Sequence, residues 1–240
     1  MAGNADILDP RRVLLVGGSS SFGPELARLF LADGAQVLAT TRSGGLDGLP
    51  AATMVAPLDL TQASSLDVLA STVVPRFGAL DVAVFMAGLL PGKALDAYDD
   101  HLQQTVMDTN FGGQAALLRR LLPCLRHGAQ VWMVSSISGE RGSFDPVYAA
   151  SKAALIGFVK SLATWRAPGL RANALAPALI EGSRMFDGMV PERREHHRAA
   201  TPTGRLTTPQ EVAAVLFNLC GPAWANLNGQ VIRINGGAYV

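Results

Sequence analysis

The sequence predicts an α/β protein whose core is a doubly wound, seven-stranded parallel sheet with helices on both faces. Short runs of β-forming residues alternate with helical stretches along the chain, as expected when helical crossovers connect parallel strands. Several β-forming runs, such as Val13–Val16 and Val82–Phe85, are apolar at every position, which is typical of strands covered on both faces. Apolar residues make up 49% of the 240 positions, so the chain can bury a large core.

The predicted strands are short and rich in β-branched and aliphatic residues. In chain order they are Arg12–Val16, Gln36–Thr40, Thr53–Ala56, Val82–Met86, Gln130–Ser135, Ala172–Leu175 and Gln230–Ile234. The predicted helices lie between these strands, and their apolar residues recur at a spacing near 3.6. They are Pro24–Ala32, Ser64–Phe77, Asp99–Leu125, Val147–Trp165 and Pro209–Cys220.

Residues 178–205 show no clear hydrophobic period. This stretch follows the sixth predicted strand, at the edge where parallel sheets bind ligands. Its length is typical of a functional lid. No linker, composition break or internal repeat divides the chain, so we expect one domain over residues 1–240 with the lid inside it.

Charge and composition argue against several classes of protein. Twenty basic and 19 acidic residues give a net charge of +1, which indicates no surface for nucleic acid or an anionic membrane. No apolar run is long enough to span a bilayer, and the N-terminus lacks a signal-peptide core, so a cytoplasmic protein is expected. Cys124 and Cys220 are too few and too isolated to indicate a disulfide framework or a metal site.

A glycine-rich turn follows the first predicted strand. It reads Gly17-Gly18-Ser19-Ser20-Ser21-Phe22-Gly23, and Pro24 then suits the first position of a helix. Glycines let backbone N–H groups approach a diphosphate, and the helix N-terminus stabilises its negative charge. Taken alone, the segment is also compatible with a plain turn between a strand and a helix.

Two further positions bear on which dinucleotide such a turn would bind. The second strand is followed by Thr41 and Arg42 rather than by an acidic residue, and these side chains can hold a ribose 2′-phosphate. Asp59, after the third strand, can meet an adenine amino group. Both positions have a plainer interpretation that stays open: Arg42 as an exposed loop residue, and Asp59 as the cap of the next helix.

Tyr148 and Lys152 form the most informative pair. Their i, i+4 spacing places a phenol and an ammonium on one face of a helix. A nearby cation lowers the pKa of a phenol from about 10, so that it can exchange a proton at neutral pH. Ser135 and Ser136 end the fifth predicted strand, where a hydroxyl can bind a substrate oxygen beside the phenol.

In these motifs the chain resembles the short-chain dehydrogenases/reductases over essentially its whole length. The resemblance implies a Rossmann-type fold, a nicotinamide dinucleotide cofactor and an oxidoreductase activity. A basic residue at the position of Arg42 goes with NADP(H) preference in that family, with NAD(H) as the other possibility. The matching segments are Gly17–Gly23, Asp59-Leu60, Ala87-Gly88, Asn110, Ser135–Gly139, Tyr148–Lys152, Arg171–Pro177 and Asn235-Gly236-Gly237.

The same resemblance implies four catalytic residues. Ser136 would polarise the substrate oxygen, and Tyr148 would be the general acid or base. Lys152 would hold the nicotinamide ribose and depress the Tyr148 pKa, and Asn110 would hold a water that relays protons from Lys152. The resemblance also implies cofactor contacts from Gly17, Ser19, Ser20, Ser21, Phe22, Gly23, Thr41, Arg42, Asp59, Leu60, Ala87, Gly88, Tyr148, Lys152, Pro177, Ala178 and Ile180.

The chain departs from the family pattern without losing a catalytic residue. The interval between the serine and the tyrosine is one residue shorter than the commonest form, and the threonine that usually contacts the carboxamide is absent. The substituted positions are Val16 and Ser21 in the glycine-rich turn, Phe85 and Met86 in place of two asparagines, and Ala178 in place of a glycine.

The expected substrate pocket is mostly apolar, which favours a hydrophobic ketone or alcohol. Met185, Phe186 and Met189 have helical spacing in the lid, and they are equally compatible with packing of the lid on the body. Arg141 and Arg184 can meet an anionic tail of the substrate or be ordinary surface residues. The other residues expected to face the pocket are Leu89, Leu90, Phe144 and Val147.

These observations predict an NADP(H)-dependent oxidoreductase that interconverts a small-molecule ketone and a secondary alcohol, with Tyr148 as acid or base. The alternative is a non-catalytic nucleotide-sensing or assembly protein with the same fold. No metal is expected, because the side chains of His196 and His197 diverge on a helix. The two longest predicted helices carry apolar faces that the family buries between subunits, so the resemblance implies a homotetramer or dimer.

Overall fold

Seven parallel strands form a single sheet in the computed structural model of the chain, which describes residues 10–42, 48–165 and 169–240. Their order in the sheet is β3-β2-β1-β4-β5-β6-β7, and each neighbouring pair is parallel. The predicted doubly wound α/β fold is therefore confirmed. The strands are β1 (Arg12–Val16), β2 (Gln36–Thr41), β3 (Met54–Pro57), β4 (Leu80–Phe85), β5 (Leu125–Val134), β6 (Arg171–Pro177) and β7 (Val231–Ile234).

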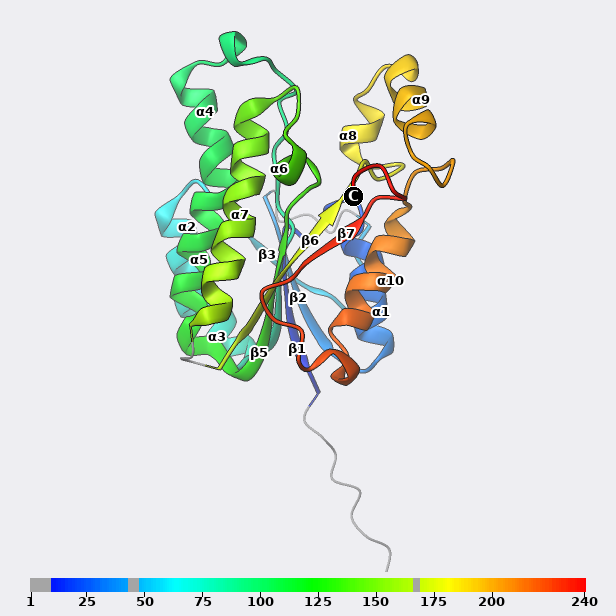
Figure 1. Ribbon diagram of the computed structural model, residues 1–240. Helices are drawn as coiled ribbons and strands as arrows, with labels where there is room; N and C mark the ends of the chain where they lie inside the picture. The colour runs from blue at the N-terminus through cyan, green and yellow to red at the C-terminus, as the bar shows by residue number, and fades with distance from the viewer. Residues whose placement is uncertain (1–9, 43–47, 166–168) are drawn as a thin grey trace, which may run out of the picture.

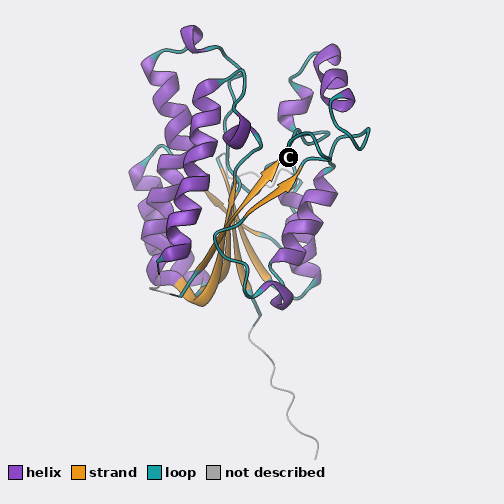
Figure 2. Ribbon diagram, in the orientation of Figure 1, coloured by secondary structure: helices purple, strands orange, loops and turns teal. Residues whose placement is uncertain are grey.

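Helices cover both faces of the sheet, and two short ones stand above the carboxyl ends of its strands (Figures 1 and 2). One face carries α1 (Gly23–Ala32) and α10 (Pro209–Leu219). The helices above the strand ends are α8 (Arg184–Asp187) and α9 (Pro191–Ala199). On the other side lie α2 (Ala63–Val68), α3 (Val74–Phe77), α4 (Asp100–Met107), α5 (Gly113–Leu121), α6 (Ser138–Arg141) and α7 (Pro146–Thr164).

Separate apolar clusters bury the two faces of the sheet. Val13 and Leu15 of β1 belong to the cluster under α1 and α10, whereas Leu14 and Val16 belong to the cluster under α5 and α7. Successive side chains of a strand point to opposite faces. The unbroken apolar run in β1 therefore follows from burial on both sides, as the sequence predicted.

The stretch predicted as one helix over Asp99–Leu125 is divided in the structure. A π-helical turn, η3 (Asp108–Gly112), separates α4 from α5, and a 3₁₀ turn, η4 (Leu122–Cys124), ends it. Pro123 lies in that 3₁₀ turn, since proline has no N–H for an α-helical hydrogen bond. Leu125 then begins β5, which starts earlier than the predicted Gln130.

The helix predicted over Ser64–Phe77 is also divided, by a π-helical turn, η1 (Leu69–Val73). Pro75 follows this turn at the start of α3 and removes one backbone donor from the helical ladder. The remaining short turns are η2 (Leu95–Ala97) and η5 (Pro222–Trp224). Other predicted boundaries differ from the observed ones by one or two residues.

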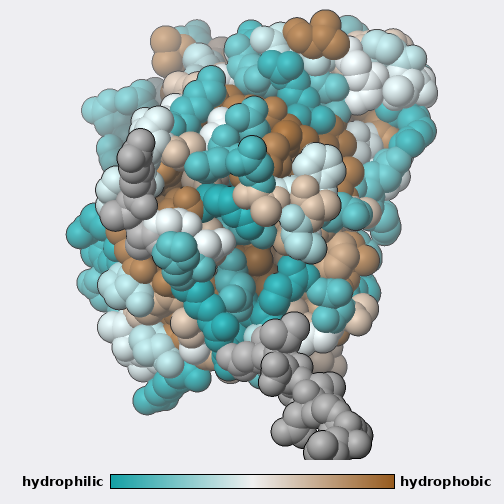
Figure 3. Space-filling view, turned by 60° about the horizontal axis from the view of Figure 1, so that its bottom comes forward, coloured by the Kyte–Doolittle hydropathy of each residue, from teal (hydrophilic) through white to brown (hydrophobic). Residues whose placement is uncertain are grey.

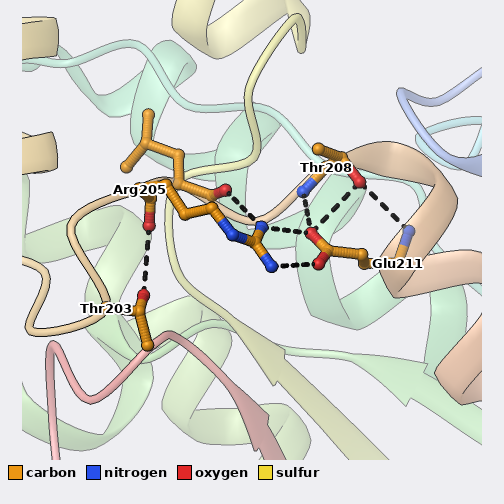
Figure 4. A network of polar contacts seen from close by, with 5 residues as sticks. Thr203, Arg205, Thr208 and Glu211 are labelled. Atoms are coloured by element: carbon orange, nitrogen blue, oxygen red, sulfur yellow. Dashed lines mark hydrogen bonds and ion pairs between the residues drawn. The ribbon is translucent and has the colours of Figure 1, made fainter.

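A capping network fixes the start of α10 (Figure 4). The Thr208 hydroxyl accepts a hydrogen bond from the backbone N–H of Glu211 at 3.3 Å, and the Glu211 carboxylate accepts one from the Thr208 N–H at 2.9 Å. Arg205 donates to both carboxylate oxygens, at 2.8 and 2.5 Å. The hydrogen bond from Arg205 is the largest cause that lowers the pKa of Glu211 to about 2. The end of the 178–205 stretch is thereby tied to the body.

Hydrophilic side chains cover much of the face shown in Figure 3, and hydrophobic ones gather toward its upper part. Within the described ranges, no helix is long and apolar enough to cross a membrane. The same ranges contain no group of three or more His, Cys, Asp or Glu side chains placed to hold a metal ion.

Candidate active site

A cavity of about 930 Å³ lies at the carboxyl edge of the sheet. Val16, Thr41, Val134 and Pro177, the last residues of β1, β2, β5 and β6, all line it. Residues of α8 and α9 form part of its wall. From β1 the chain adds strands toward one edge of the sheet, and from β4 it adds them toward the other edge. Doubly wound folds bind ligands at such a switch point.

The glycine-rich turn forms one wall of this cavity. Gly17 has a φ of 78°, and a Cβ placed there would lie 2.8 Å from the Cα of Ala87, so only glycine fits between β1 and the end of β4. Gly23 does not line the cavity; a Cβ on it would lie 2.0 Å from the carbonyl oxygen of Gly18. The structure assigns Gly23 to packing of the turn rather than to ligand contact. The turn residues that line the cavity are Gly17, Ser19, Ser20, Ser21 and Phe22.

Two hydroxyls at this end of the cavity have no partner. The Oγ of Ser20 and the Oγ1 of Thr41 are buried and accept or donate no hydrogen bond within the described chain. A buried polar group without a partner costs about 1–3 kcal/mol. Both residues line the cavity, and phosphate or ribose oxygens of a dinucleotide would satisfy them. The residues present at this end therefore fit the cofactor that the sequence predicts.

Arg42 and Asp59 also line the cavity. The Arg42 side chain is 80% exposed and its Nη2 lies 3.4 Å from Asp59 Oδ2. Asp59 Oδ1 accepts hydrogen bonds from the N–H and the hydroxyl of Thr61, at 2.9 and 2.7 Å. These hydrogen bonds are the largest cause that holds the pKa of Asp59 below its usual value, and Arg42 lowers it by a smaller amount. The N-cap of α2 is Gln62, so the interpretation of Asp59 as a helix cap is wrong.

Tyr148 and Lys152 reach the same cavity from α7. Their exposed fractions are only 6% and 3%. The Lys152 Nζ lies 5.9 Å from the centre of the Tyr148 ring and donates a hydrogen bond to the carbonyl oxygen of Val134 at 2.8 Å. Burial lowers the pKa of Lys152 to about 8, because removal from water disfavours its charged form.

The structure corrects the prediction of a lowered phenol pKa. Burial raises the pKa of Tyr148 to about 12; a hydrogen bond with Ser136 lowers it, and the charge of Asp145 raises it further. The Lys152 ammonium lies over the ring, and loss of hydration of the phenolate dominates. The phenol of Tyr148 is therefore neutral at neutral pH.

The two serines after β5 have different partners. The Ser135 hydroxyl donates to the carbonyl oxygen of Lys152 at 2.8 Å. The Ser136 hydroxyl accepts from the N–H of Ser138 at 3.1 Å, which leaves its own proton available toward Tyr148. A Cβ on Gly139 would lie 2.7 Å from the Lys152 carbonyl carbon. The close packing of α6 on α7 thus requires glycine at position 139.

Asn110 lies behind the cavity wall rather than in it. It is fully buried, and its Oδ1 accepts a hydrogen bond from the N–H of Leu89 at 2.7 Å. Its Nδ2 donates to the Leu89 carbonyl and to the Ser151 hydroxyl, both at 2.9 Å. Asn110 therefore fixes the strand-end segment that holds Leu89 against the cavity. Its predicted role as the holder of a relay water stays a prediction.

The predicted substrate residues divide into two groups. Phe186 does not line the cavity: it packs with Leu179 and Leu206, and the Arg194 guanidinium lies 4.7 Å from its ring centre. Neighbouring residues of a helix point in different directions, so Met185 lines the cavity while Phe186 packs against its own segment and the adjacent Leu206. Val147 is buried outside the cavity as well. The predicted substrate residues that do line it are Leu89, Leu90, Phe144, Met185 and Met189. The predicted cofactor residues Leu60, Ala87, Gly88, Pro177, Ala178 and Ile180 line it as well.

Asp145 is a residue that the sequence analysis missed. It is 3% exposed and accepts hydrogen bonds from the Tyr98 hydroxyl at 2.8 Å and from the N–H groups of Gly92 and Tyr148 at 2.9 Å. It thereby caps α7 and joins the loop after β4 to the catalytic helix. An aspartate directly before Pro146 is a helix-start pattern that could have revealed it.

Comparisons with known proteins cover almost the whole chain. The family model described as "Enoyl-(Acyl carrier protein) reductase" matches residues 16–239. The 3-oxoacyl-[acyl-carrier-protein] reductase FabG of Vibrio cholerae is 30% identical over 244 residues, with 97% of this chain and 99% of the relative covered. FabG of Escherichia coli is 30% identical over 237 residues, with 95% and 96% covered.

Two solved structures are similar in fold and in sequence. The short-chain dehydrogenase/reductase from Brucella melitensis, described as a glucose/ribitol dehydrogenase, has a TM-score of 0.89 and 29% identity, with 96% of this chain and 97% of that chain covered. A variant of actinorhodin polyketide ketoreductase with NADPH has a TM-score of 0.86 and 27% identity over the same shares of the chains.

Proposed function

The chain belongs to the short-chain dehydrogenase/reductase family, and from this premise we propose that it is an NADP(H)-dependent oxidoreductase that interconverts a ketone and a secondary alcohol. The observation that carries the proposal is the shared cavity. Ser136, Tyr148 and Lys152 line it together with Ser20 and Thr41, whose hydroxyls lack partners in the described chain.

The residues at the turn end of the cavity would hold the dinucleotide. Ser20 and Thr41 offer their free hydroxyls to phosphate and ribose oxygens, and the exposed Arg42 is placed to pair with a 2′-phosphate. The structural relative solved with NADPH supports the preference for NADP(H). When bound, this cofactor supplies a hydride to the carbonyl carbon.

Three residues would act on the substrate oxygen during reduction. Tyr148, neutral at pH 7 because burial raises its pKa to about 12, gives its proton to the oxygen as negative charge develops there. Ser136 donates a hydrogen bond to the same oxygen. Lys152 keeps its ammonium over the Tyr148 ring and stabilises the phenolate that remains after the proton has left.

We also propose that residues 1–240 form one domain in which residues 178–205 act as a lid over the substrate. Met185 and Met189 of this segment line the cavity, while Phe186 packs with Leu179 and Leu206 at the two ends of the segment. Relatives named as 3-oxoacyl reductases and the apolar lining suggest an oxoacyl compound as the substrate. A homo-oligomer and a cytoplasmic location stay predictions.

Cofactor binding and turnover together test the proposed function. Fluorescence titration at matched salt is expected to give a Kd for NADPH at least about tenfold lower than for NADH, or about 1.4 kcal/mol. The Arg42→Asp variant is expected to reverse that ratio. Oxidation of NADPH should then follow the addition of a 3-oxoacyl thioester.

Each other result has a defined meaning. An unchanged ratio of the Kd values for NADPH and NADH in Arg42→Asp would show that Arg42 does not bind the 2′-phosphate. Binding of NADPH without turnover of any carbonyl compound would favour the nucleotide-sensing alternative. If neither dinucleotide binds, an assembly protein with the same fold becomes the better interpretation.

A further inference from the structure

The substrate end of the cavity is lined by cationic side chains. Arg141, Arg184 and Arg193 all line it, and the imidazole of His197 lines it beside them. The carboxylates among the lining residues are Asp59, which lies beside Arg42 at the turn end, and Asp145. Asp145 is buried, and its oxygens already accept hydrogen bonds from Tyr98 and from backbone N–H groups. The cationic groups therefore have no free carboxylate facing them across the cavity.

The side chains of Arg141, Arg184 and Arg193 have no hydrogen-bonding or ion-pairing partner within residues 10–42, 48–165 and 169–240. Their neighbours on α9 are different: Arg194 donates to the carbonyl oxygen of Asp187, and Arg198 pairs with Glu181, both at 2.7 Å. Arg194 and Arg198, which do not line the cavity, therefore have polar partners. The Arg193 guanidinium has no such partner among the described residues and can bind a ligand in the cavity.

These cations come from separate elements and act on one another. Arg141 ends α6, which stands across from α8 and α9 in Figure 1. Burial, followed by the charges of His196, Arg193 and Arg141, lowers the pKa of His197. Like charges gathered at a cavity repel one another and create a field that attracts an anion.

An apolar wall adjoins these cations. Phe144 and Met185 line the cavity and are 62% and 37% exposed, and Val190 beside them is 60% exposed. The Arg193 guanidinium lies 5.7 Å from the centre of the Phe144 ring. Such an arrangement suits a ligand whose apolar part contacts Phe144 while a negative group meets Arg193.

We propose that Arg141 and Arg193 bind an oxyanion carried on an apolar arm of the carbonyl substrate, with Arg184 beside them. The oxyanion is a carboxylate, as in a free oxo acid, or a phosphate, as in the arm of an oxoacyl thioester. The inference rests on the proposed function, because it takes the carbonyl group of the substrate to lie at Tyr148. It explains which part of the cavity would select among ketones of similar size.

Matched substrates test this proposal. One pair is a medium-chain oxo acid and its methyl ester; the other is a 3-oxoacyl coenzyme A thioester and the uncharged N-acetylcysteamine thioester. We expect the wild type to show a kcat/KM at least about tenfold higher for the charged member of one pair, as charge-assisted hydrogen bonds predict. A preference in the first pair identifies a carboxylate, and one in the second pair identifies a phosphate.

Variants of Arg141 and Arg193 test whether these two residues cause the preference for the charged substrate. Arg141→Gln and Arg193→Gln are each expected to lower kcat/KM about tenfold for the charged substrate and to leave the uncharged one unchanged. Arg76→Gln, an exposed arginine of α3 outside the cavity, is the matched control and should change neither value. Equal turnover of charged and uncharged substrates by all variants would overturn the anion site and leave the proposed function standing.

Calorimetric binding separates the two proposals if turnover is absent. Titration of the oxo acid and its methyl ester into the protein reads the anion site without catalysis. Tighter binding of the acid, lost in Arg193→Gln but kept in Arg76→Gln, would support the site although the reductase function had failed. Equal affinity for the charged and the uncharged compound, in this pair and in the thioester pair titrated in the same way, would refute the site.

Discussion

The protonation states of single residues govern the chemistry proposed for this cavity. Tyr148 holds its proton up to a pKa of about 12, and Lys152 loses its proton near a pKa of about 8. Both shifts have burial as the first cause, since it disfavours phenolate and ammonium alike. At neutral pH the pair therefore consists of a neutral phenol and a cation, which suits donation of a proton to a ketone oxygen.

Replacement of Tyr148 by phenylalanine tests the proton donor directly. The Tyr148→Phe variant is expected to lower kcat by about 10²–10⁴-fold, the usual contribution of a general acid. Its Kd for NADPH should stay close to that of the wild type, because only the hydroxyl is removed. Stopped-flow reduction and fluorescence titration on the same preparation measure the two quantities; full activity in the variant would rule out the mechanism.

The pH dependence of reduction should show one break, at the pKa of Lys152. Lys152 must carry its proton to stabilise the phenolate, so kcat/KM is expected to fall as pH rises through about 8. Tyr148 stays protonated in that range and adds no second break. Steady-state rates with circular dichroism at each pH would check that the protein remains folded; a break near pH 10 instead would contradict the effect of burial on Lys152.

At the scale of elements, short polar networks position α7 and the loop after β4. Asp145 links the loop after β4 to the N-terminus of α7 through Tyr98 and backbone donors. Asn110, placed by the π-helical turn η3, fixes Leu89 in the same region. Both side chains act through backbone groups, and thereby hold the loop next to Tyr148.

The Asp145→Asn variant should be less stable and should hold Tyr148 less strongly protonated. An amide cannot accept from all the donors that surround Asp145, and each unsatisfied buried group costs about 1–3 kcal/mol. Loss of the negative charge also removes one cause of the raised Tyr148 pKa. Urea denaturation and spectroscopic titration of the tyrosines measure both effects, with Asp96→Asn, exposed in the same loop, as control.

The capping network of α10 is expected to stabilise the protein less at acid pH. Glu211 has a pKa of about 2 in the folded protein, below its usual value of 4.5. The stability that its ionised form contributes is therefore present above about pH 4.5 and is lost as the pH falls toward 2. Glu211→Gln is expected to lower the free energy of unfolding at pH 7 by about 1 kcal/mol, as for other helix caps.

Denaturation of the wild type and of Glu211→Gln at several pH values tests this prediction. The wild type and Glu211→Gln should converge as the pH falls to 2 and below, because protonation makes the Glu211 side chain neutral, like the amide of the variant. Glu192→Gln on α9, an exposed glutamate outside the capping network, serves as control. A constant difference between Glu211→Gln and the wild type across the whole pH range would show that the Arg205 pair is not its source.

For the whole molecule, the parallel sheet is what brings the site together. Its strand order places the ends of β1, β2, β5 and β6 along one edge, so segments that are distant in sequence share one cavity. The two apolar clusters that bury the sheet keep this edge rigid from both sides. The lid segment approaches the same edge from above (Figure 1), which leaves the substrate end to be shaped by α6, α8 and α9.

Much of the fold and part of the site could be predicted from local patterns. The apolar run of β1, the glycine-rich turn and the Tyr148–Lys152 spacing each express a short-range rule of backbone or helix geometry. The interruption of the helix at η3 could not be predicted in this way, because the contacts of Asn110 with Leu89 and Ser151 join distant parts of the chain. The position of Phe186 could not be predicted either, because Leu206, with which it packs, lies far from it along the chain.

The sequence by itself determined the order of strands and helices, the position of the glycine-rich turn and the residue types available for proton transfer, since these depend on neighbours along the chain. The tertiary structure decided the direction of the Tyr148 pKa shift and the grouping of Arg141, Arg184 and Arg193 around one cavity. Burial and charge–charge interactions depend on distances through space, which periodicity and spacing along a chain do not specify.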